Sequence, residues 1–398
     1  MNAFIIDGIR TPIGNFAGTL SPVRADDLAA HVIRELVQRH AGLDPSVISD
    51  VIMGCANQAG EDNRNVARMA LLLAGLPVSV PGETVNRLCA SGLSAVVQAA
   101  RASHAGEGDI FIAGGVEHMT RGPLVMSKAS SAYGRDQQLY DSSFGWRFIH
   151  PRMQELYGTE AMGETAENLA EKFSISREDQ DHFALSSQRK ASASAEWFQG
   201  EIAPVLIPRK KGDPLLFSHD EFIRPDSSEE GLAALRPAFR KGGTVTAGNA
   251  SGLNDGAAAL LIASEEGIRR HGLQPMARVV SSAVTGTEPR IMGIGPVEAS
   301  KLALSRAGLT LDDMDLIEIN EAFAAQVLAC TRQLGLEDQD ARINPHGGAI
   351  ALGHPLGMSG ARLALSAARQ LKATGGEYAL VTMCIGVGQG YAAVLERV

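Results

Sequence analysis

Several residue types are scarce in this chain, and each scarcity narrows the possible functions. The chain has four cysteines in 398 residues, and their positions (55, 89, 330 and 384) fit neither a disulfide scaffold nor a CxxC zinc site. No apolar run approaches the roughly 18–20 residues that cross a membrane. The formal net charge of −9 disfavours general binding to nucleic acid. We therefore expect a cytoplasmic protein of a reducing compartment, with no metal site and with no nucleic-acid or membrane partner.

Aromatic residues are also few, with 12 Phe, 5 Tyr and 2 Trp against 43 Gly. This balance is typical of tight turns and closely packed layers of small side chains. The length suits two or three domains of roughly 100–200 residues each. Residues 1–8 have the pattern of a strand and not of a charged leader followed by an apolar stretch, so we expect no targeting signal.

Short apolar segments alternate with amphipathic segments along most of the chain. Strands are expected at residues 4–7, 50–54, 82–86, 109–114, 256–263, 316–319 and 378–382. Helices are expected at residues 26–40, 63–74, 90–103 and 321–334. Because strands that alternate with helices usually form βαβ units, the pattern predicts an α/β fold with a mostly parallel sheet.

The sequence contains a weak internal repeat. A shift of 268 residues places Ser91 and Gly92 on Ser359 and Gly360, and it aligns residues 110–113 with 378–381. A neighbouring shift of 265 aligns residues 50–52 with 315–317. The identities are few, but the order strand, helix, strand recurs with them. We therefore predict two similar halves packed as a pseudo-dimer, an N-terminal half of residues 1–120 and 241–270 and a C-terminal half of residues 271–398.

Residues 121–240 differ in composition from the two halves. They are richer in polar and aromatic residues, with a helical section at 161–195 and a basic run at 209–211. We interpret them as an inserted loop domain that covers a ligand, although a solvated surface decoration would show the same charge run. The segment 244–255 that follows has small residues that suit the close approach of a ligand.

One segment has the pattern of a catalytic nucleophile. Residues 85–92 run from an expected strand through Cys89 into an apolar helix, so the thiol lies at a strand-to-helix turn. Unpaired backbone N–H groups and the helix dipole favour a thiolate there, and the thiolate is the form that attacks carbonyls and thioesters. A small buried hydrophobic Cys would fit the same segment. The choice between these two readings depends on the second half of the chain.

Three segments of the second half carry polar residues that a core does not need. Asn320 follows the strand 316–319, where it can face a ligand at the carboxyl end of the strand, cap the next helix, or do both. His354 lies in a glycine-dense loop at the pseudo-equivalent of the Cys89 turn. Cys384 and Gly386 follow the strand 378–382 without a helix after them, so a nucleotide loop is disfavoured. Corresponding turns of two facing halves would bring Cys384 and His354 toward Cys89.

In their order and spacing, these segments resemble the thiolase family, the acetyl-CoA acyltransferases. The similarity runs essentially end to end and rests on NEAFA at 320–324, GGAIALGHPLGMSG at 347–360 and MCIGVGQG at 383–390. It implies the thiolase fold, in which two similar halves form layered αβαβα packing with an inserted loop domain over the coenzyme A site. It also implies a homodimer or homotetramer, acyl-CoA and coenzyme A as substrates, and no bound cofactor.

The resemblance implies a role for each catalytic candidate. Cys89 would be the acylated nucleophile, His354 would activate it, and Cys384 would be the acid and base. Asn320, through a bound water, and His354 would hold the thioester oxygen. The backbone N–H groups of Cys89 and Gly386 would form a second oxyanion hole.

The resemblance also implies a coenzyme A site. Ser251 matches the serine that meets the pantetheine arm, and Met162 and Phe323 are further candidates for contact with the acyl-CoA. The anionic coenzyme A needs cations from the loop domain, for which Arg224 and Lys210 are candidates. His346 stands where the family often has Asn, and we interpret it as a structural loop residue.

Several stretches are similar to thiolases that split 3-oxoadipyl-CoA into succinyl-CoA and acetyl-CoA, namely residues 24–27, 55–66, 145–148 and 353–360. The distal carboxylate of this substrate would need a cation, for which Arg147 and Arg135 are candidates. The alternative is an acetoacetyl-CoA or broad-range 3-ketoacyl-CoA thiolase. Enzymes specific for acetoacetyl-CoA typically have His where Ala161 stands, so this residue disfavours that choice.

Two other classes of protein share this type of fold. An acyl-CoA-binding or lipid-transfer relative without activity would not need Cys89, Asn320, His354 and Cys384 together. A ketoacyl synthase would surround its cysteine with histidines and would lack a second cysteine in the MCIG segment. Both classes are therefore disfavoured.

Overall fold

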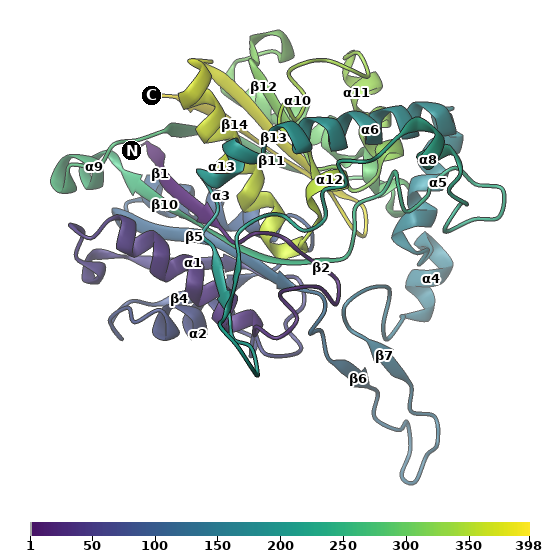
Figure 1. Cartoon of the computed structure of the whole chain (residues 1–398), viewed down its shortest axis with the longest axis horizontal. Coiled ribbons are helices and arrows are strands. Elements are labelled where there is room, and N and C mark those ends of the chain that lie inside the picture. Colours follow the sequence, from purple (N-terminus) through teal and green to yellow (C-terminus); the bar gives the residue numbers. More distant parts are fainter. Residues whose placement is uncertain (1) are drawn as a thin grey trace.

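A computed structural model describes residues 2–398 (Figure 1). Strands form one mixed sheet in the order β12-β13-β14-β11-β1-β10-β5-β3-β4, with β2 beside β10. The N-terminal half consists of β1 (Ala3–Arg10), β2 (Gly14–Asn15), α1 (Ala25–Arg39), β3 (Asp50–Gly54), α2 (Val66–Leu73), β4 (Gly82–Val85), α3 (Ser91–Ala105), β5 (Ile110–His118), β10 (Asn254–Ser264) and α9 (Glu265–His271).

The C-terminal half follows the same plan. It consists of β11 (Ala277–Gly286), α10 (Gly295–Ala307), β12 (Leu316–Ile319), α11 (Ala324–Leu334), α12 (Ala349–Leu352), α13 (Leu356–Thr374), β13 (Tyr378–Ile385) and β14 (Gln389–Arg397). Short 3₁₀ turns lie at Pro45–Val47, Pro289–Ile294 and Leu311–Asp313.

Five layers are stacked, as the resemblance implied (Figure 1). One core lies between α1, α2 and the N-terminal strands. A second core contains α3 and α13 together with the facing sides of both sets of strands. A third core lies between the C-terminal strands and α10 and α11. The αβαβα packing is therefore confirmed, and α3 and α13 form its middle layer.

The internal repeat corresponds to this architecture. The strands β5 and β13 begin at residues 110 and 378, which is the shift of 268 seen in the sequence. Each is flanked by a parallel strand, β3 and β12 respectively, and by an antiparallel one, β10 and β14. The halves meet where β1 pairs with β11 at Phe4–Arg278 and Ile5–Ala277.

The prediction of a mostly parallel sheet is wrong. Among the strand pairs of the large sheet, only β3-β4, β3-β5 and β12-β13 are parallel, and the others are antiparallel. The reason is that β13 and β14 are joined by a tight hairpin turn at residues 386–388, in which Val387 and Gly388 have positive φ. A short turn of this kind can only join antiparallel strands.

Three expected helices have different limits. The helix expected at 321–334 begins at Ala324, because Phe323 before it has extended backbone angles. The helix expected at 63–74 begins at Val66, since Asn63 and Arg64 have positive φ and the Asn65 side chain caps the helix. The helical section expected at 161–195 divides into α5 (Met162–Lys172) and α6 (Arg177–Ala193). The break contains Ser174 with φ 53° and ends at Ser176, whose side chain caps α6.

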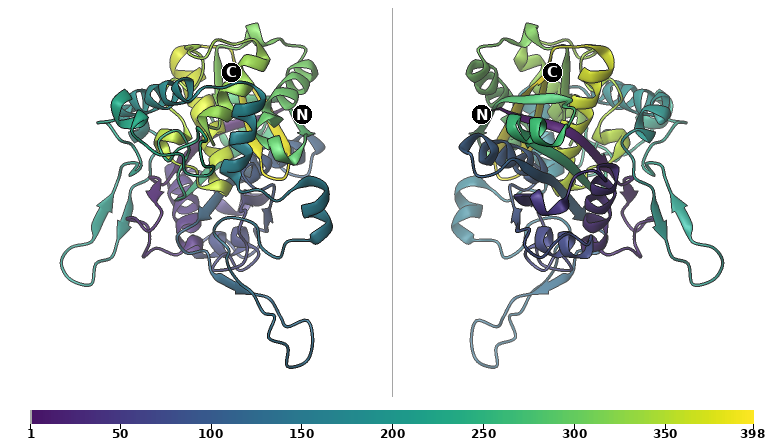
Figure 2. Two further views of the ribbon diagram at one scale, coloured as in Figure 1. Left: turned by 90° about the vertical axis from the view of Figure 1, so that its right-hand side faces the viewer. Right: turned by 90° about the vertical axis from the view of Figure 1, so that its left-hand side faces the viewer.

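The inserted segment lies between β5 and β10, which are neighbours in the sheet. Besides α5 and α6 it contains β6 (Leu124–Met126), β7 (Leu139–Asp141), α4 (Pro151–Tyr157), α7 (Ala195–Gln199), β8 (Val205–Ile207), β9 (Leu215–Phe217) and α8 (Glu229–Ala233). Figure 2 shows that the hairpins β6-β7 and β8-β9 project from the layers. The domain limits at 121 and 240 stay a prediction.

Glycines allow α13 of the middle layer to pack closely against α3 and against β5. A Cβ atom at Gly92 in α3 would lie 2.8 Å from the backbone nitrogen of Ala361 in α13. A Cβ atom at Gly115 in β5 would lie 2.7 Å from the carbonyl carbon of Gly357, in the first turn of α13. Backbone atoms cannot move aside as a flexible side chain does, so these positions need glycine.

We expect Gly115→Ala to lower the free energy of unfolding by about 1–3 kcal/mol or more, because the added methyl overlaps the backbone of α13. Urea unfolding followed by circular dichroism measures this change. Gly42→Ala is the matched control, since a Cβ atom there has open space. Equal stability of the two variants would show that the contact between β5 and α13 can relax.

Candidate active site at the interface of the two halves

Cys89 lies in a tight turn between β4 and α3, as predicted. The Ala90 N–H donates to the Arg87 carbonyl at 3.0 Å, and the Ser91 hydroxyl donates to the Leu88 carbonyl at 2.7 Å. Leu88 has φ 48°, in the left-handed region that residues other than glycine rarely adopt. The thiol therefore sits on a sharply turned segment whose shape is fixed by several hydrogen bonds.

The Cys89 sulfur faces the turn that joins β13 to β14. The backbone N–H groups of Gly386 and of Cys89 itself are directed at this sulfur and lower its pKa. Cys384 in β13 lies close enough that charge on Cys89 raises the pKa of Cys384. The fold thus brings together three predicted site residues, although Cys89 lies nearly 300 positions before Cys384 and Gly386 in the sequence.

Burial opposes the thiolate that the sequence led us to expect at Cys89. Desolvation raises the pKa of Cys89 to about 11, and it outweighs the two backbone N–H groups. The backbone N–H groups favour the thiolate, as expected, but burial keeps Cys89 a thiol in the resting protein. Cys89 needs a nearby base to become a nucleophile.

His354 has the properties of such a base. Its backbone N–H donates to Asn254 Oδ1 at 2.9 Å, and its Nδ1 lies 2.6 Å from the Ser359 hydroxyl. Because the Ser359 hydroxyl donates to the Pro355 carbonyl at 2.9 Å, it accepts the proton of His354 Nδ1. Burial, followed by the charge of Arg362, lowers the pKa of His354 to about 4. The imidazole is therefore neutral, with an unprotonated Nε2.

Asn320 lies beside His354 at the end of β12. Its side-chain Nδ2 is 3.4 Å from His354 Nε2, and its backbone N–H donates to Thr382 of β13 at 3.0 Å. The helix α11 is capped by Phe323, so Asn320 is not a helix cap. Within residues 2–398, the buried Oδ1 of Asn320 has no hydrogen-bond partner. The ligand-facing alternative for Asn320 is the one that fits.

The turns of Cys89 and His354 are neighbours. Cys89 directly precedes α3 and His354 directly precedes α13, and the first turns of these helices pack together at Gly92 and Ala361. The pseudo-symmetry thus places the two turns face to face, as the repeat predicted.

Small apolar groups line the space around the thiols. A Cβ atom at Gly386 would lie 3.4 Å from Leu88 and 3.7 Å from the Met162 sulfur. Cys384 shares a buried cluster with Phe323. Met162 and Phe323, both predicted contacts of the acyl-CoA, therefore border the site.

The other predicted coenzyme A residues lie in two separate regions of the structure. The Ser251 N–H donates to the carbonyl of Ala322, beside Phe323. Its neighbour Gly252 packs on Phe222, and the Arg224 guanidinium lies 5.0 Å from the centre of that ring. These contacts bring Ser251 and Arg224 into one region next to the site. Lys210 lies in the turn of the hairpin β8-β9, whose base packs into the core with α1, so the structure does not group it with the others.

His346 has a structural environment, as expected. It stacks on Trp197 with 4.3 Å between ring centres, and its ring nitrogens lie 2.9 Å from the Ser194 hydroxyl and 2.7 Å from Gln370 Oε1.

Ser359, Asn254 and Glu117 were missed by reasoning from the sequence. Ser359 and Asn254 hold His354, and Glu117 accepts the N–H of Gly357, in the first turn of the helix after His354. The internal repeat contained a signal for Ser359, because it aligned Ser359 with Ser91. The hydroxyl of each serine donates to a carbonyl in the turn at the start of its helix. No comparable signal marked the other two.

Within residues 2–398, no group of three or more His, Cys, Asp or Glu side chains is arranged to hold a metal ion. No helix in the same range is long and apolar enough to cross a membrane.

Comparisons with known proteins agree with this geometry. The family models described as the thiolase N-terminal and C-terminal domains match residues 3–266 and 273–397. The 3-oxoadipyl-CoA/3-oxo-5,6-dehydrosuberyl-CoA thiolase of Escherichia coli (strain K12) is 60% identical, over 100% of this chain and 99% of the relative. The beta-ketoadipyl-CoA thiolase of Pseudomonas aeruginosa is 58% identical, over 99% of both chains.

A solved structure shows the same fold. The acetyl-CoA acetyltransferase of Bacillus anthracis superimposes with a TM-score of 0.92 at 41% sequence identity, over 100% of this chain and 99% of that chain. The shared fold and the end-to-end identity agree with the two matched domains. The chain belongs to the thiolase family of acyltransferases, which act on acyl-CoA and coenzyme A.

Proposed function

We propose that this chain cleaves 3-oxoadipyl-CoA with coenzyme A into succinyl-CoA and acetyl-CoA. The observation that carries the chemistry is the meeting of Cys89, Cys384 and the Gly386 N–H. The helix that follows the neutral His354 packs on the helix that follows Cys89. The names of the two relatives that are 60% and 58% identical support this substrate. Coenzyme A is the second substrate, and no bound cofactor takes part.

The first step is activation of Cys89. His354 Nε2 takes the thiol proton, which is possible because Ser359 keeps the other ring proton on Nδ1. The Cys89 thiolate then attacks the 3-keto carbon. The N–H groups of Gly386 and Cys89 point toward the sulfur in the resting protein. The oxyanion forms next to the sulfur and accepts hydrogen bonds from the same two groups. Each donor of this kind stabilises a transition state by about 2.7–4 kcal/mol.

The second step breaks the carbon–carbon bond. The bond between C2 and C3 cleaves, and its electron pair forms the enolate of acetyl-CoA while Cys89 keeps the succinyl group as a thioester. The enolate oxygen is held by the new Nε2–H of His354 and by a water on Asn320. The enolate carbon takes the proton of Cys384, which gives acetyl-CoA and leaves Cys384 as the thiolate.

The third step transfers the acyl group. The Cys384 thiolate takes the thiol proton of coenzyme A, and the coenzyme A thiolate attacks the Cys89 thioester. Cys89 leaves as a thiolate and recovers its proton from His354 Nε2. Burial raises the pKa of Cys384 well above its ordinary value, so its thiolate is a strong base for this purpose.

The carboxylate of the acyl chain needs a cation near the acyl pocket, and Arg147 is the better of the two candidates. It is half-buried and donates to the Ser142 carbonyl at 3.1 Å, and it has no carboxylate partner in residues 2–398. Its neighbour Trp146 donates to the Glu160 carbonyl, next to the segment that carries Met162. Arg135 is exposed between β6 and β7.

Assembly into a homodimer or homotetramer is also part of the proposal. The hairpin β6-β7 projects from the layers (Figure 1) and exposes the large apolar residues Leu124, Met126, Tyr133 and Leu139. A contact with another copy of the chain would bury them.

We expect purified protein to cleave 3-oxoadipyl-CoA with a kcat/KM at least tenfold above that for acetoacetyl-CoA, and Cys89→Ser to lose this activity. Loss of the thioester absorbance in the presence of coenzyme A measures both rates. A preference for acetoacetyl-CoA would contradict the proposed substrate and leave the thiolase reaction in place.

We expect Arg147→Ala to lower kcat/KM for 3-oxoadipyl-CoA by about tenfold, since a lost charge-assisted contact costs about 1.5–3 kcal/mol. The rate with acetoacetyl-CoA, which has no distal carboxylate, is expected to stay unchanged. Arg135→Ala is the control. An unchanged preference in both variants would exclude these arginines as the carboxylate site.

We expect Ser359→Ala to reduce kcat by about tenfold with little change in KM, because His354 loses the acceptor that fixes its tautomer. Ser366→Ala, a buried serine of the same helix that does not touch His354, is the control. Steady-state thiolysis measures both constants. Full kcat in the Ser359 variant would show that Ser359 is not needed to orient the imidazole.

A further inference from the structure

Glu117 is a buried carboxylate with an unusual set of partners. Its side chain is 2% exposed, at the end of β5. One carboxylate oxygen accepts the N–H groups of Ala56 at 2.9 Å and Gly357 at 2.8 Å, and the other accepts the N–H of Asn57 at 3.0 Å. Two donors lie in the loop after β3, and the third lies in the first turn of α13. Glu117 therefore joins the N-terminal half to residues 350–357, which carry His354 and form the His354 loop.

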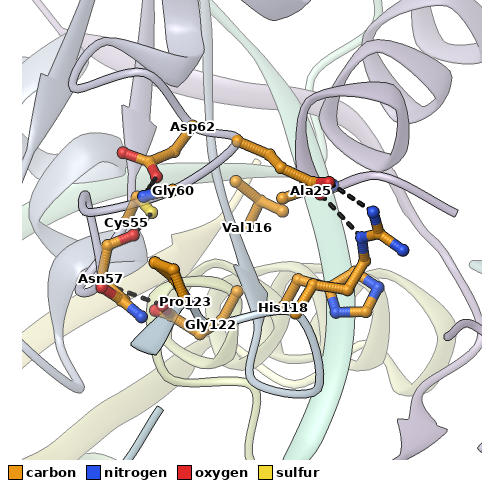
Figure 3. Close-up of a pocket in the computed structure, with 12 residues that line it drawn as sticks. Ala25, Cys55, Asn57, Gly60, Asp62, Val116, His118, Gly122 and Pro123 are labelled. Carbon is orange, nitrogen blue, oxygen red and sulfur yellow. Dashed lines mark hydrogen bonds and ion pairs between the residues drawn. The ribbon is translucent and has the colours of Figure 1, made fainter. Parts of the chain in front are cut away.

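Glu117 also lies in the wall of a small cavity. Glu117 lines the cavity together with Cys55 and Asn57 from the loop after β3 and with Val116 and His118 from β5 (Figure 3). The charged and titratable groups that face Glu117 are Asp62, Cys55 and Cys89. Within residues 2–398 no cation pairs with the Glu117 carboxylate, and its partners are the three N–H groups.

The other end of the His354 loop is held by a second buried carboxylate. Glu321 of the C-terminal half accepts the Ile350 N–H at 3.1 Å, the Ser187 hydroxyl at 2.6 Å and the Asn344 side chain at 2.7 Å. His354 therefore lies between two backbone N–H groups, those of Ile350 and Gly357, that are fixed by opposite halves. On the N-terminal side, Glu117 holds the Gly357 N–H and Asn254 holds the His354 N–H, so both residues fix His354 relative to the half that carries Cys89.

We propose that Glu117 is a positioning residue of the reaction, which fixes the His354 loop against the half that carries Cys89 and places a negative charge near the Cys89 sulfur. The inference rests on the proposed thiolase reaction. Charge on Glu117 raises the pKa of Cys89, after the larger effect of burial. Burial raises the pKa of Glu117 to about 7, so the carboxylate is charged at pH 8.5, where its charge adds to the larger effect of burial on Cys89.

Replacement by glutamine separates this role from a structural one. Glu117→Gln keeps the shape of the side chain and removes its negative charge. Its NH₂ group cannot accept hydrogen bonds from the backbone N–H groups that the carboxylate oxygen accepts. We expect kcat for thiolysis to fall at least tenfold, with the KM for coenzyme A within twofold. We expect the alkylation of Cys89 by iodoacetamide at pH 8.5 to become about threefold faster, because the thiolate fraction rises. A slower enzyme with a more reactive nucleophile is not expected from simple destabilisation.

Two further variants complete the experiment. Glu117→Asp keeps the charge but draws the carboxylate back, so kcat is expected to fall while alkylation stays at the wild-type rate. Glu167→Gln is the matched control, because Glu167 is also a buried carboxylate that accepts backbone N–H groups, those of Thr244 and Val245, and it does not contact the His354 loop. Its kcat and its alkylation rate are expected to match the wild type.

Three results would overturn the proposal: a Glu117→Gln kcat within twofold of wild type, an unchanged alkylation rate in that variant, or an equal loss of kcat in Glu167→Gln. Alkylation needs no acyl-CoA, and Cys89→Ser identifies the labelled residue. If the wild-type protein failed to cleave 3-oxoadipyl-CoA, the proposed function would fail, while the alkylation rates would still decide whether Glu117 acts on Cys89.

Discussion

The packing of α3 against α13 between the two sets of strands is the contact on which the rest of the structure depends. Each helix follows directly on a turn that carries a candidate catalytic residue, Cys89 before α3 and His354 before α13. Glycines at positions 92 and 115 let the backbones approach closely enough for the two turns to face each other.

Burial of this interface determines the protonation states in the site. Desolvation raises the pKa values of Cys89 and Cys384 and lowers that of His354, so these three side chains are neutral at rest. In the proposed reaction, charge first develops when Cys89 gives its proton to His354, and the backbone N–H groups around the sulfur are the proposed donors to the oxyanion that follows.

Fixed partners of the imidazole complete this arrangement. Ser359 and Asn254 hold His354 directly, and Glu117 and Glu321 hold its loop from opposite halves. The site is therefore a property of the interface and not of either half alone. The proposed contacts with the acyl chain, Arg147 and Met162, lie apart from these partners, in the inserted segment.

The sequence by itself determined the two-half α/β organisation, the strand-to-helix turn at Cys89 and the candidates Asn320, His354 and Cys384, because hydrophobic periodicity, glycine-dense turns and the thiolase motifs are local. The tertiary structure decided the antiparallel pairs, the protonation of Cys89 and the parts of Ser359, Asn254 and Glu117. Desolvation and hydrogen bonds between residues as distant as 117 and 357 depend on which segments meet, and no local pattern encodes that meeting.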